Sequence, residues 1–249
     1  MVNGGRTADA ELEGRKALIV GAYGGMGRAV ALTLAREGVA CALMGRSHEG
    51  LIEIANACAE AGTAAFPVVC DIAQMETIES AVRQIVDTLG GLNFLVNCAG
   101  FYQKTTADEG ALETWDRVLD VNLKGTYHLA RHALPEINKS PGGAIIKIGA
   151  IPSSYSGAGA YLATTRGLDG YADALFEDIR EYGTKVCIIR PGFVNTSLAV
   201  AASDDRLDPA LMIQPEDIAR TVLFVLTMPE TACPTEITIR PQRSPYLRT

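Results

Sequence analysis

The sequence predicts a single α/β domain: a doubly wound, seven-stranded parallel sheet covered by helices on both faces. Seven short apolar runs alternate with longer segments of helical period, and such alternation produces right-handed βαβ units. The runs ACALM and VCIIR are apolar almost throughout, which is typical of strands buried on both sides. Hydrophobic residues make up 48% of the 249 residues, enough for one large core.

The apolar runs place the strands at intervals along the chain. Seven are expected, over 17–20, 40–44, 64–69, 94–97, 144–148, 186–189 and 236–239. Between them lie six segments of helical period, expected as helices over 26–37, 49–61, 75–89, 113–137, 159–182 and 215–226. No internal repeat or linker interrupts this order, so residues 13–249 are expected to form one domain.

Three segments fall outside the alternation. Residues 1–12 are expected to form a flexible N-terminal arm, and the last six residues, SPYLRT, a short tail. The stretch 195–214 stands where folds of this class often carry a mobile flap over a site.

Composition excludes several classes of function. With 22 basic and 29 acidic residues the net charge is −7, which repels polyphosphate backbones and argues against nucleic-acid binding. No apolar stretch reaches the ~20 residues of a membrane helix, and the first 15 residues lack the apolar core of a secretion signal. We therefore expect a cytoplasmic protein that binds no membrane.

Cysteine and histidine spacing predicts no metal site. The six cysteines have no C-x-x-C spacing and are expected to be reduced and buried: Cys41, Cys58, Cys70, Cys98, Cys187 and Cys233. His128 and His132 stand four residues apart, a spacing that can hold a metal, but no third ligand accompanies them. They are expected to be a surface or interface pair.

A glycine cluster follows the first expected strand. In VGAYGGMGR, Gly21, Gly25 and Gly27 have the spacing G-x-x-x-G-x-G. Glycine permits the positive φ of a tight strand-to-helix turn and lets the backbone approach a pyrophosphate. Free N–H groups and the dipole at the N-terminus of the next helix stabilise that anion. Because the cluster joins a strand to a helix, it predicts a dinucleotide site rather than a plain turn.

The end of the second strand indicates which dinucleotide binds. An NAD site usually places an acid there to accept from the ribose hydroxyls, whereas this chain has Gly45 followed by Arg46. Arg28 follows the last glycine of the turn. Guanidinium groups pair well with a 2′-phosphate, so NADP(H) is predicted over NAD(H). The alternative is that both arginines are solvated surface groups.

Taken in order, these motifs resemble those of the short-chain dehydrogenase/reductase family of Rossmann-fold enzymes. The turn looks like the family's T-G-x-x-x-G-x-G with Val20 in place of threonine, 97–100 resembles N-N-A-G, and 191–196 matches P-G-x-x-x-T. The resemblance implies an oligomer, a homodimer or homotetramer, paired through 113–137 and 159–182. It also implies a cofactor site formed by Gly21, Tyr23, Gly24, Gly25, Met26, Gly27, Arg46, Asp71, Ile72, Asn97, Ala99, Gly100, Tyr161, Pro191, Gly192, Val194 and Thr196.

The family's catalytic pattern is only half present. It uses a tyrosine as acid/base, a lysine four residues later, a serine on the preceding strand and a helix asparagine. Asn122 matches the asparagine, and aligning YLATTRGLDG with Y-x-A-S-K-x-G-x-x-G puts Tyr161 on the tyrosine but Thr165 on the lysine. Aligning IIKIGA with I-x-N-I-S-S puts Ala150 on the serine.

Other residues are candidates for the two missing roles. Thr165 can hydrogen-bond a ribose hydroxyl but brings no charge, and a serine of the loop 151–160 could present a hydroxyl to the substrate: Ser153, Ser156 or, as the chosen candidate, Ser154. Arg166 lies ~100° further round the helix than Thr165, so its side chain would have to curl back to take the role of the missing lysine. Lys147 lies three residues before Ala150, an odd offset that predicts the opposite face of a regular strand. The expected catalytic set is therefore Tyr161, Asn122, Ser154 and Thr165.

Three functions fit this pattern. The first is an NADP(H)-dependent oxidoreductase that interconverts a hydroxyl and a carbonyl on a small organic substrate, with Tyr161 as acid/base. The second is a catalytically silent NADP(H)-binding sensor, or the partner subunit of an active paralogue. The third is non-redox lyase or isomerase chemistry. Halohydrin dehalogenases resemble this family but lose the nucleotide turn, which Gly21, Gly25 and Gly27 preserve here.

Overall fold

The computed structural model describes residues 12–201 and 207–246 as a three-layer α/β/α domain. Its sheet has seven parallel strands in the order β3-β2-β1-β4-β5-β6-β7, which confirms the predicted fold class. The strands are β1 Lys16–Val20, β2 Ala40–Gly45, β3 Ala65–Val69, β4 Phe94–Asn97, β5 Ala144–Ile148, β6 Lys185–Pro191 and β7 Glu236–Ile239.

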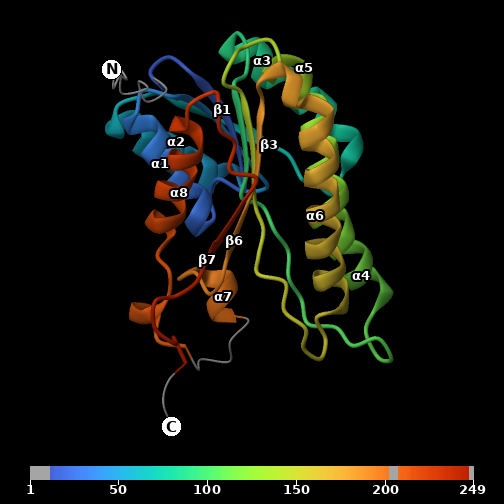
Figure 1. Cartoon of the computed structure of the whole chain (residues 1–249). Helices are drawn as coiled ribbons and strands as arrows, with labels where there is room; N and C mark the ends of the chain where they lie inside the picture. The colour runs from blue at the N-terminus through green and yellow to red at the C-terminus, as the bar shows by residue number, and fades with distance from the viewer. Residues whose placement is uncertain (1–11, 202–206, 247–249) are drawn as a thin grey trace, which may run out of the picture.

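Helices cover both faces of the sheet, which Figure 1 shows nearly edge-on. One face carries α1 (Gly25–Arg36), α2 (His48–Ala61) and α8 (Pro215–Thr227). The other carries α3 (Met75–Leu89), α4 (Leu112–Leu119), α5 (Gly125–Ile137) and α6 (Gly159–Ile179). The short helix α7 (Ser197–Ala201) lies beyond the ends of the strands.

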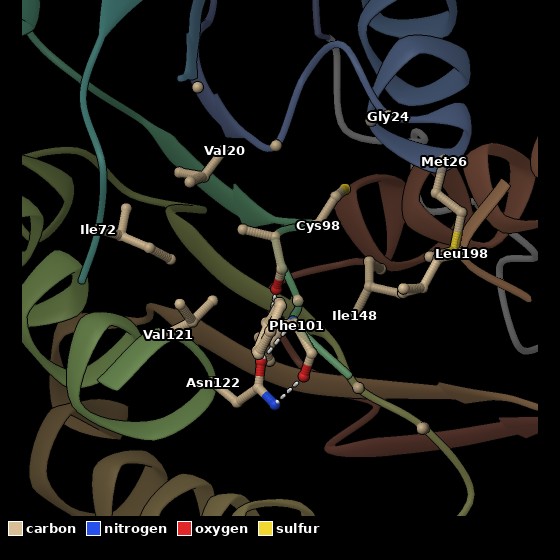
Figure 2. A pocket seen from close by; sticks show the side chains of 18 of the residues that line it. Val20, Gly24, Met26, Ile72, Cys98, Phe101, Val121, Asn122, Ile148 and Leu198 are labelled. Atoms are coloured by element: carbon tan, nitrogen blue, oxygen red, sulfur yellow. Dashed lines mark hydrogen bonds between the residues drawn. The ribbon is translucent and has the colours of Figure 1, made fainter. Parts of the chain in front are cut away.

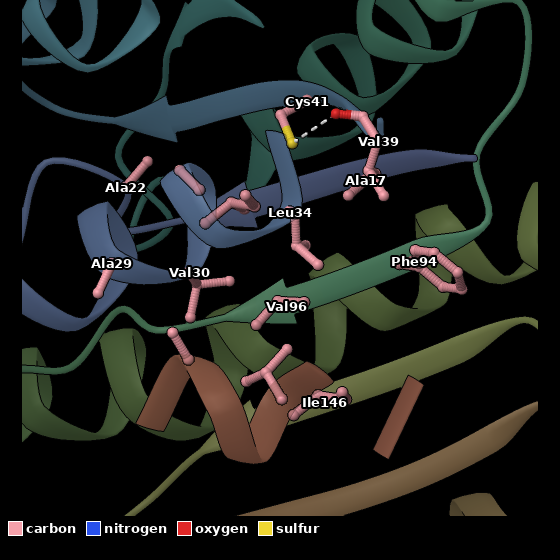
Figure 3. Close-up of a cluster of buried hydrophobic side chains, with 14 of the residues drawn as sticks. Ala17, Ala22, Ala29, Val30, Leu34, Val39, Cys41, Phe94, Val96 and Ile146 are labelled. Atoms are coloured by element: carbon pink, nitrogen blue, oxygen red, sulfur yellow. Dashed lines mark hydrogen bonds between the residues drawn. The ribbon is translucent and has the colours of Figure 1, made fainter. Parts of the chain in front are cut away.

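Each face of the sheet has its own core because successive strand residues point to opposite sides. On β1, Ala17 and Ile19 pack with the α1, α2 and α8 side, whereas Leu18 and Val20 pack with the α3, α5 and α6 side. Figure 3 shows the first of these clusters. The fully buried strands explain why their sequences are continuously apolar rather than alternating.

The strand order reverses between β1 and β4. From β1 the chain builds outward through β2 and β3, and it then returns to place β4 on the other side of β1. In open α/β sheets the connections diverge at such a point and leave a crevice beyond the carboxyl ends of the strands. This topology puts the glycine turn after β1 beside the segment that follows β4.

Most predicted elements agree with the structure to within one or two residues, and two differ. The expected helix 113–137 is interrupted by the π-helical segment Asp120–Lys124, and the expected helix 159–182 ends in a 3-10 turn at Arg180–Tyr182. A π-helical segment inserts one extra residue in a helical turn, and apolar periodicity does not report it.

The structure describes parts of the expected N-terminal arm, C-terminal tail and flap, and these parts differ from the expectations. Residues 1–11 of the expected arm lie outside the described residues, but Leu12 is 5% exposed and belongs to the core, so the domain begins earlier than predicted. In the expected flap 195–214, α7 and the 3-10 turn Pro209–Leu211 are regular, and residues 202–206 lie outside the described residues. Tyr246 of the expected tail forms an antiparallel bridge with Leu207.

Within the described parts of the chain, no helix combines the length and the apolar character needed to cross a membrane. All six cysteines are free, and four of them are buried, as expected: Cys41, Cys58, Cys70 and Cys187. Cys98 and Cys233 are partly exposed.

Candidate active site

The glycine turn is built so that no side chain fills it. Gly21 has a φ of +73°, which favours glycine, and a Cβ there would lie 2.9 Å from the Ala99 backbone. A Cβ on Gly27 would lie 2.2 Å from the Gly21 carbonyl oxygen. Gly24 is the N-cap of α1, and the first turn of that helix has neither a side-chain cap nor an acidic residue. The turn therefore presents free N–H groups and a positive dipole end to an anion.

A cavity of about 250 Å³ opens from this turn along the carboxyl ends of the central strands. Figure 2 shows part of its lining, which comes from segments far apart in the sequence. Of the predicted site residues, it is lined by Gly21, Tyr23, Gly24, Gly25, Met26, Gly27, Arg46, Asp71, Ile72, Ala99, Gly100, Asn122, Tyr161, Thr165 and Thr196.

The lining of the cavity includes an acid, Asp71, that interacts with two guanidinium groups. Asp71 accepts a hydrogen bond from Arg117 Nη2 at 2.8 Å and one from the Ala73 N–H at 3.1 Å. Burial opposes ionisation of this carboxyl, but these hydrogen bonds and the charges of Arg117 and Arg46 lower its pKa. Asp71 is therefore an ionised acceptor at neutral pH.

Asn122 holds the loop that follows β4. It lies in the π-helical segment, and its Oδ1 accepts from the Phe101 N–H while its Nδ2 donates to the Phe101 carbonyl, both at 2.8 Å (Figure 2). The same Nδ2 donates to Thr164 Oγ1 at 3.5 Å. With both ends of its amide engaged, Asn122 is a positioning residue that fixes this loop against α6.

Tyr161 lines the cavity from the first turn of α6. Burial, and then the nearby Tyr102, raise the pKa of its hydroxyl above the ordinary value. The Tyr102 ring packs edge-on against it with the ring centroids 5.2 Å apart. Thr165 also lines the cavity, but its hydroxyl donates to the Tyr161 carbonyl at 2.8 Å in its own helix. The helix therefore places a phenol in the cavity and no charge beside it.

The position of Lys147 differs from what the alternation of side chains along a strand predicted. Lys147 lines the same cavity as Ala150, although an odd offset predicted opposite faces. β5 ends at Ile148, so the alternation of strand residues does not extend to Gly149 and Ala150. The odd offset between Lys147 and Ala150 therefore does not determine which faces they occupy. Lys147 is 6% exposed, and its Nζ donates to the Ala99 carbonyl at 2.5 Å.

Several predicted residues do not line the cavity. Ser154 is exposed in its loop, so the structure does not support its expected role beside the substrate. Asn97 does not line the cavity; its side chain donates to Thr126 Oγ1 and accepts from the Ala99 N–H, each at 3.0 Å. The others form the end of β6 and the segment after it: Pro191, Gly192 and Val194.

The arginines are divided between the cavity and the surface. Arg28 is exposed on α1 and does not line the cavity, contrary to the expectation that it faces a 2′-phosphate. Arg166 is exposed beside Asp169 at 3.9 Å and does not line the cavity. Arg117 and Lys147, both in the cavity, were missed as site residues. Arg117 pairs with Asp71 across 46 residues, and no local motif signals that contact.

The two histidines lie together on α5, with ring centroids 6.2 Å apart. Within residues 12–201 and 207–246, no group of three or more metal-ligating side chains is close enough to hold a metal.

A doubly wound sheet with an open glycine turn at the point where the strand order reverses defines a fold of Rossmann type, and an acid and a tyrosine line its cavity. The family model described as short chain dehydrogenase matches residues 15–207. The chain belongs to this family.

Known relatives agree with the assignment. An uncharacterized oxidoreductase of Staphylococcus aureus is 32% identical over 227 residues, which cover 90% of this chain and 96% of the relative. The crystal structure of a short chain dehydrogenase from Burkholderia cenocepacia in complex with NADP is similar, with a TM-score of 0.84 and 26% identity over 93% of this chain and 98% of that one. So is an alcohol dehydrogenase from Thermococcus sibiricus complexed with 5-hydroxy-NADP, with a TM-score of 0.83 and 25% identity over 93% and 99%.

Proposed function

We propose that the chain is an NADP(H)-dependent oxidoreductase that interconverts a hydroxyl and a carbonyl on a small organic substrate. The observation that carries the proposal is that one cavity joins the open glycine turn to the Tyr161 hydroxyl. The test is NADPH consumption, followed by absorbance, with a panel of aldehydes, ketones and 3-oxo acids. Oxidation of NADPH that depends on both protein and carbonyl supports the proposal. Binding without consumption across the panel contradicts it.

The residues of the cavity fit a nicotinamide dinucleotide. The turn at Gly21 and Gly27 leaves room for a pyrophosphate, and Asp71 offers an ionised acceptor near the adenosine end. When bound, the cofactor supplies or accepts the hydride. Tyr161 then gives a proton to the substrate oxygen during reduction and takes it back during oxidation. Asn122 keeps the wall of the cavity at Phe101 in place during both.

The preference for NADP(H) rests on the residues at the end of β2. Arg46 lines the cavity, and the position before it, where an acid would favour NAD(H), has no room for a side chain. A Cβ on Gly45 would lie 2.6 Å from the Tyr23 ring. A positive group without a neighbouring acid on this strand favours a cofactor that carries a 2′-phosphate. The solved relative from Burkholderia cenocepacia binds NADP.

Replacing Arg46 with alanine is expected to weaken NADPH binding at least about fivefold and to leave NADH binding nearly unchanged. A charge pair with phosphate is worth ~1 kcal/mol in water and more when partly buried, and Arg46 is exposed at the cavity rim. Dissociation constants measured by fluorescence titration check this. Arg28→Ala is the matched control, because Arg28 is exposed outside the cavity and its loss should change neither constant. Equal weakening of both cofactors by Arg46→Ala contradicts the proposal.

The alternative is an NADP(H)-binding protein without turnover, acting as a sensor or as the partner of an active paralogue. It is favoured by Ala150 and Thr165, which line the cavity but bring neither the hydroxyl nor the charge of the family pattern. Binding of NADPH without consumption in the panel supports this alternative. Assembly into a homodimer or homotetramer stays a prediction.

A further inference from the structure

Lys147 is a buried amine with no carboxylate partner among residues 12–201 and 207–246. It lies in β5 between Asn97 of β4 and Ile188 of β6, and it is 6% exposed. Its Nζ donates to the Ala99 carbonyl at 2.5 Å, and no salt bridge found among the described residues includes it. An ammonium has three N–H donors, so two remain for other acceptors. A buried charge left this way is costly, and a bound ligand that supplies acceptors removes the cost.

No anionic side chain is found beside Lys147 in the part of the chain that the structure describes. Burial lowers the pKa of its ammonium to about 8, so the group is still mostly charged at neutral pH. Three of the titratable side chains that line a cavity with Lys147 have a pKa that burial raises: Cys98, which follows β4, and Tyr161 and Tyr171 of α6. All three are neutral at pH 8, and no salt bridge among the described residues gives the ammonium a counter-charge.

The position of Lys147 in the cavity separates it from the other cations. Arg46 and Arg117 gather around Asp71 at one end. Lys147 lines the cavity from the carboxyl end of β5, together with Ile148 and the two residues that follow the strand. Its acceptor Ala99 belongs to the segment after β4, next to the Phe101 loop that Asn122 holds against α6. Thr165 on α6 lines the cavity too, but it carries no charge and its hydroxyl donates to its own helix.

We propose that the Lys147 ammonium binds the nicotinamide cofactor through its ribose hydroxyls at the Tyr161 end of the cavity. The family pattern has a lysine at the position of Thr165 in α6. In this chain, Lys147 on β5 supplies a cation in its place. The inference rests on the proposed function, because it requires that the cavity binds this cofactor. It makes Lys147 a cofactor-binding residue that the alignment of catalytic positions did not reveal.

The test is the dissociation constant for NADPH in Lys147→Met, which keeps the length of the side chain and removes its charge. We expect binding about tenfold weaker, the loss of one charge-assisted hydrogen bond. Lys185→Met is the matched control: Lys185 is 4% exposed on β6 but does not line the cavity, so the constant should not change. In Lys147→Met/Thr165→Lys, an ammonium from α6 should restore much of the affinity.

The outcomes distinguish this inference from the proposed function. If Lys147→Met binds NADPH as tightly as the natural protein does, the inference is overturned and the proposed function stands. If the natural protein does not bind NADPH, both fall. Should Lys147→Met fail to fold, the natural protein still decides. Its affinity should fall as the pH rises through the lowered pKa of Lys147, about 8, and a constant affinity from pH 7 to 10 overturns the inference.

Discussion

Replacing Tyr161 with phenylalanine is expected to lower turnover by roughly 10²–10⁴-fold, the usual contribution of a positioned acid/base group. The substitution removes one hydroxyl and leaves the ring that packs against Tyr102. The melting temperature should change little, because no hydrogen bond of this hydroxyl is found among the described residues. Steady-state rates with any active carbonyl substrate, measured beside the melting temperature, check the prediction.

A control beyond the far end of α6 distinguishes an effect on the reaction from a general effect of removing a tyrosine hydroxyl. Tyr182 lies beyond the other end of α6 and is 59% exposed, so Tyr182→Phe should keep the natural rate. A Tyr161→Phe variant with more than a tenth of the natural rate would show that another group transfers the proton.

The second large effect is expected from Gly27→Ala. The added methyl carbon would lie 2.2 Å from the Gly21 carbonyl oxygen, so the turn must open and its N–H groups must leave their positions. Overpacking of this kind costs about 1–3 kcal/mol, which corresponds to roughly a five- to 150-fold loss if it falls on cofactor binding. NADPH titration checks the loss of affinity, and thermal unfolding shows how much of the cost falls on the fold itself.

Gly170→Ala is the matched control for this substitution. Gly170 lies in α6, and a Cβ there would meet nothing within 4 Å. Alanine is favoured over glycine inside a helix, so this variant should be slightly more stable and bind NADPH normally. Unchanged binding in Gly27→Ala would contradict the assignment of the turn as the pyrophosphate site.

The fold could be predicted from sequence because its signals are local. The apolar runs at β4, β5 and β7 and the helical period of α3 have the predicted bounds, since each depends only on residues within that element. The glycine turn is likewise a local motif, and its residues do line the cavity. The break at Asp120–Lys124 was missed because a π-helical segment keeps an approximately helical pattern of apolar residues.

The candidate site was predicted only where motif and position coincide. Tyr161 and Asp71 lie in the cavity as expected, whereas Ser154 is exposed in a loop whose path no local pattern determines. Arg117 reaches the site through a pairing with Asp71 that joins distant segments. Lys147 was set aside because its odd offset from Ala150 predicted the opposite face, yet both residues line the cavity at the end of β5. Long-range contacts and strand ends are therefore what the sequence did not reveal.

The most direct test of the central claim is transfer of deuterium from NADPH labelled at C4 of the nicotinamide. The natural protein is incubated with the carbonyl panel and labelled cofactor, and the alcohol products are analysed by mass spectrometry. We expect an alcohol that carries one deuterium when the transferring face of the nicotinamide is labelled, and at most about a hundredth as much labelled alcohol from Tyr161→Phe over the same time. NADPH that binds but transfers no deuterium to any carbonyl would contradict it and leave a cofactor-binding protein without redox chemistry.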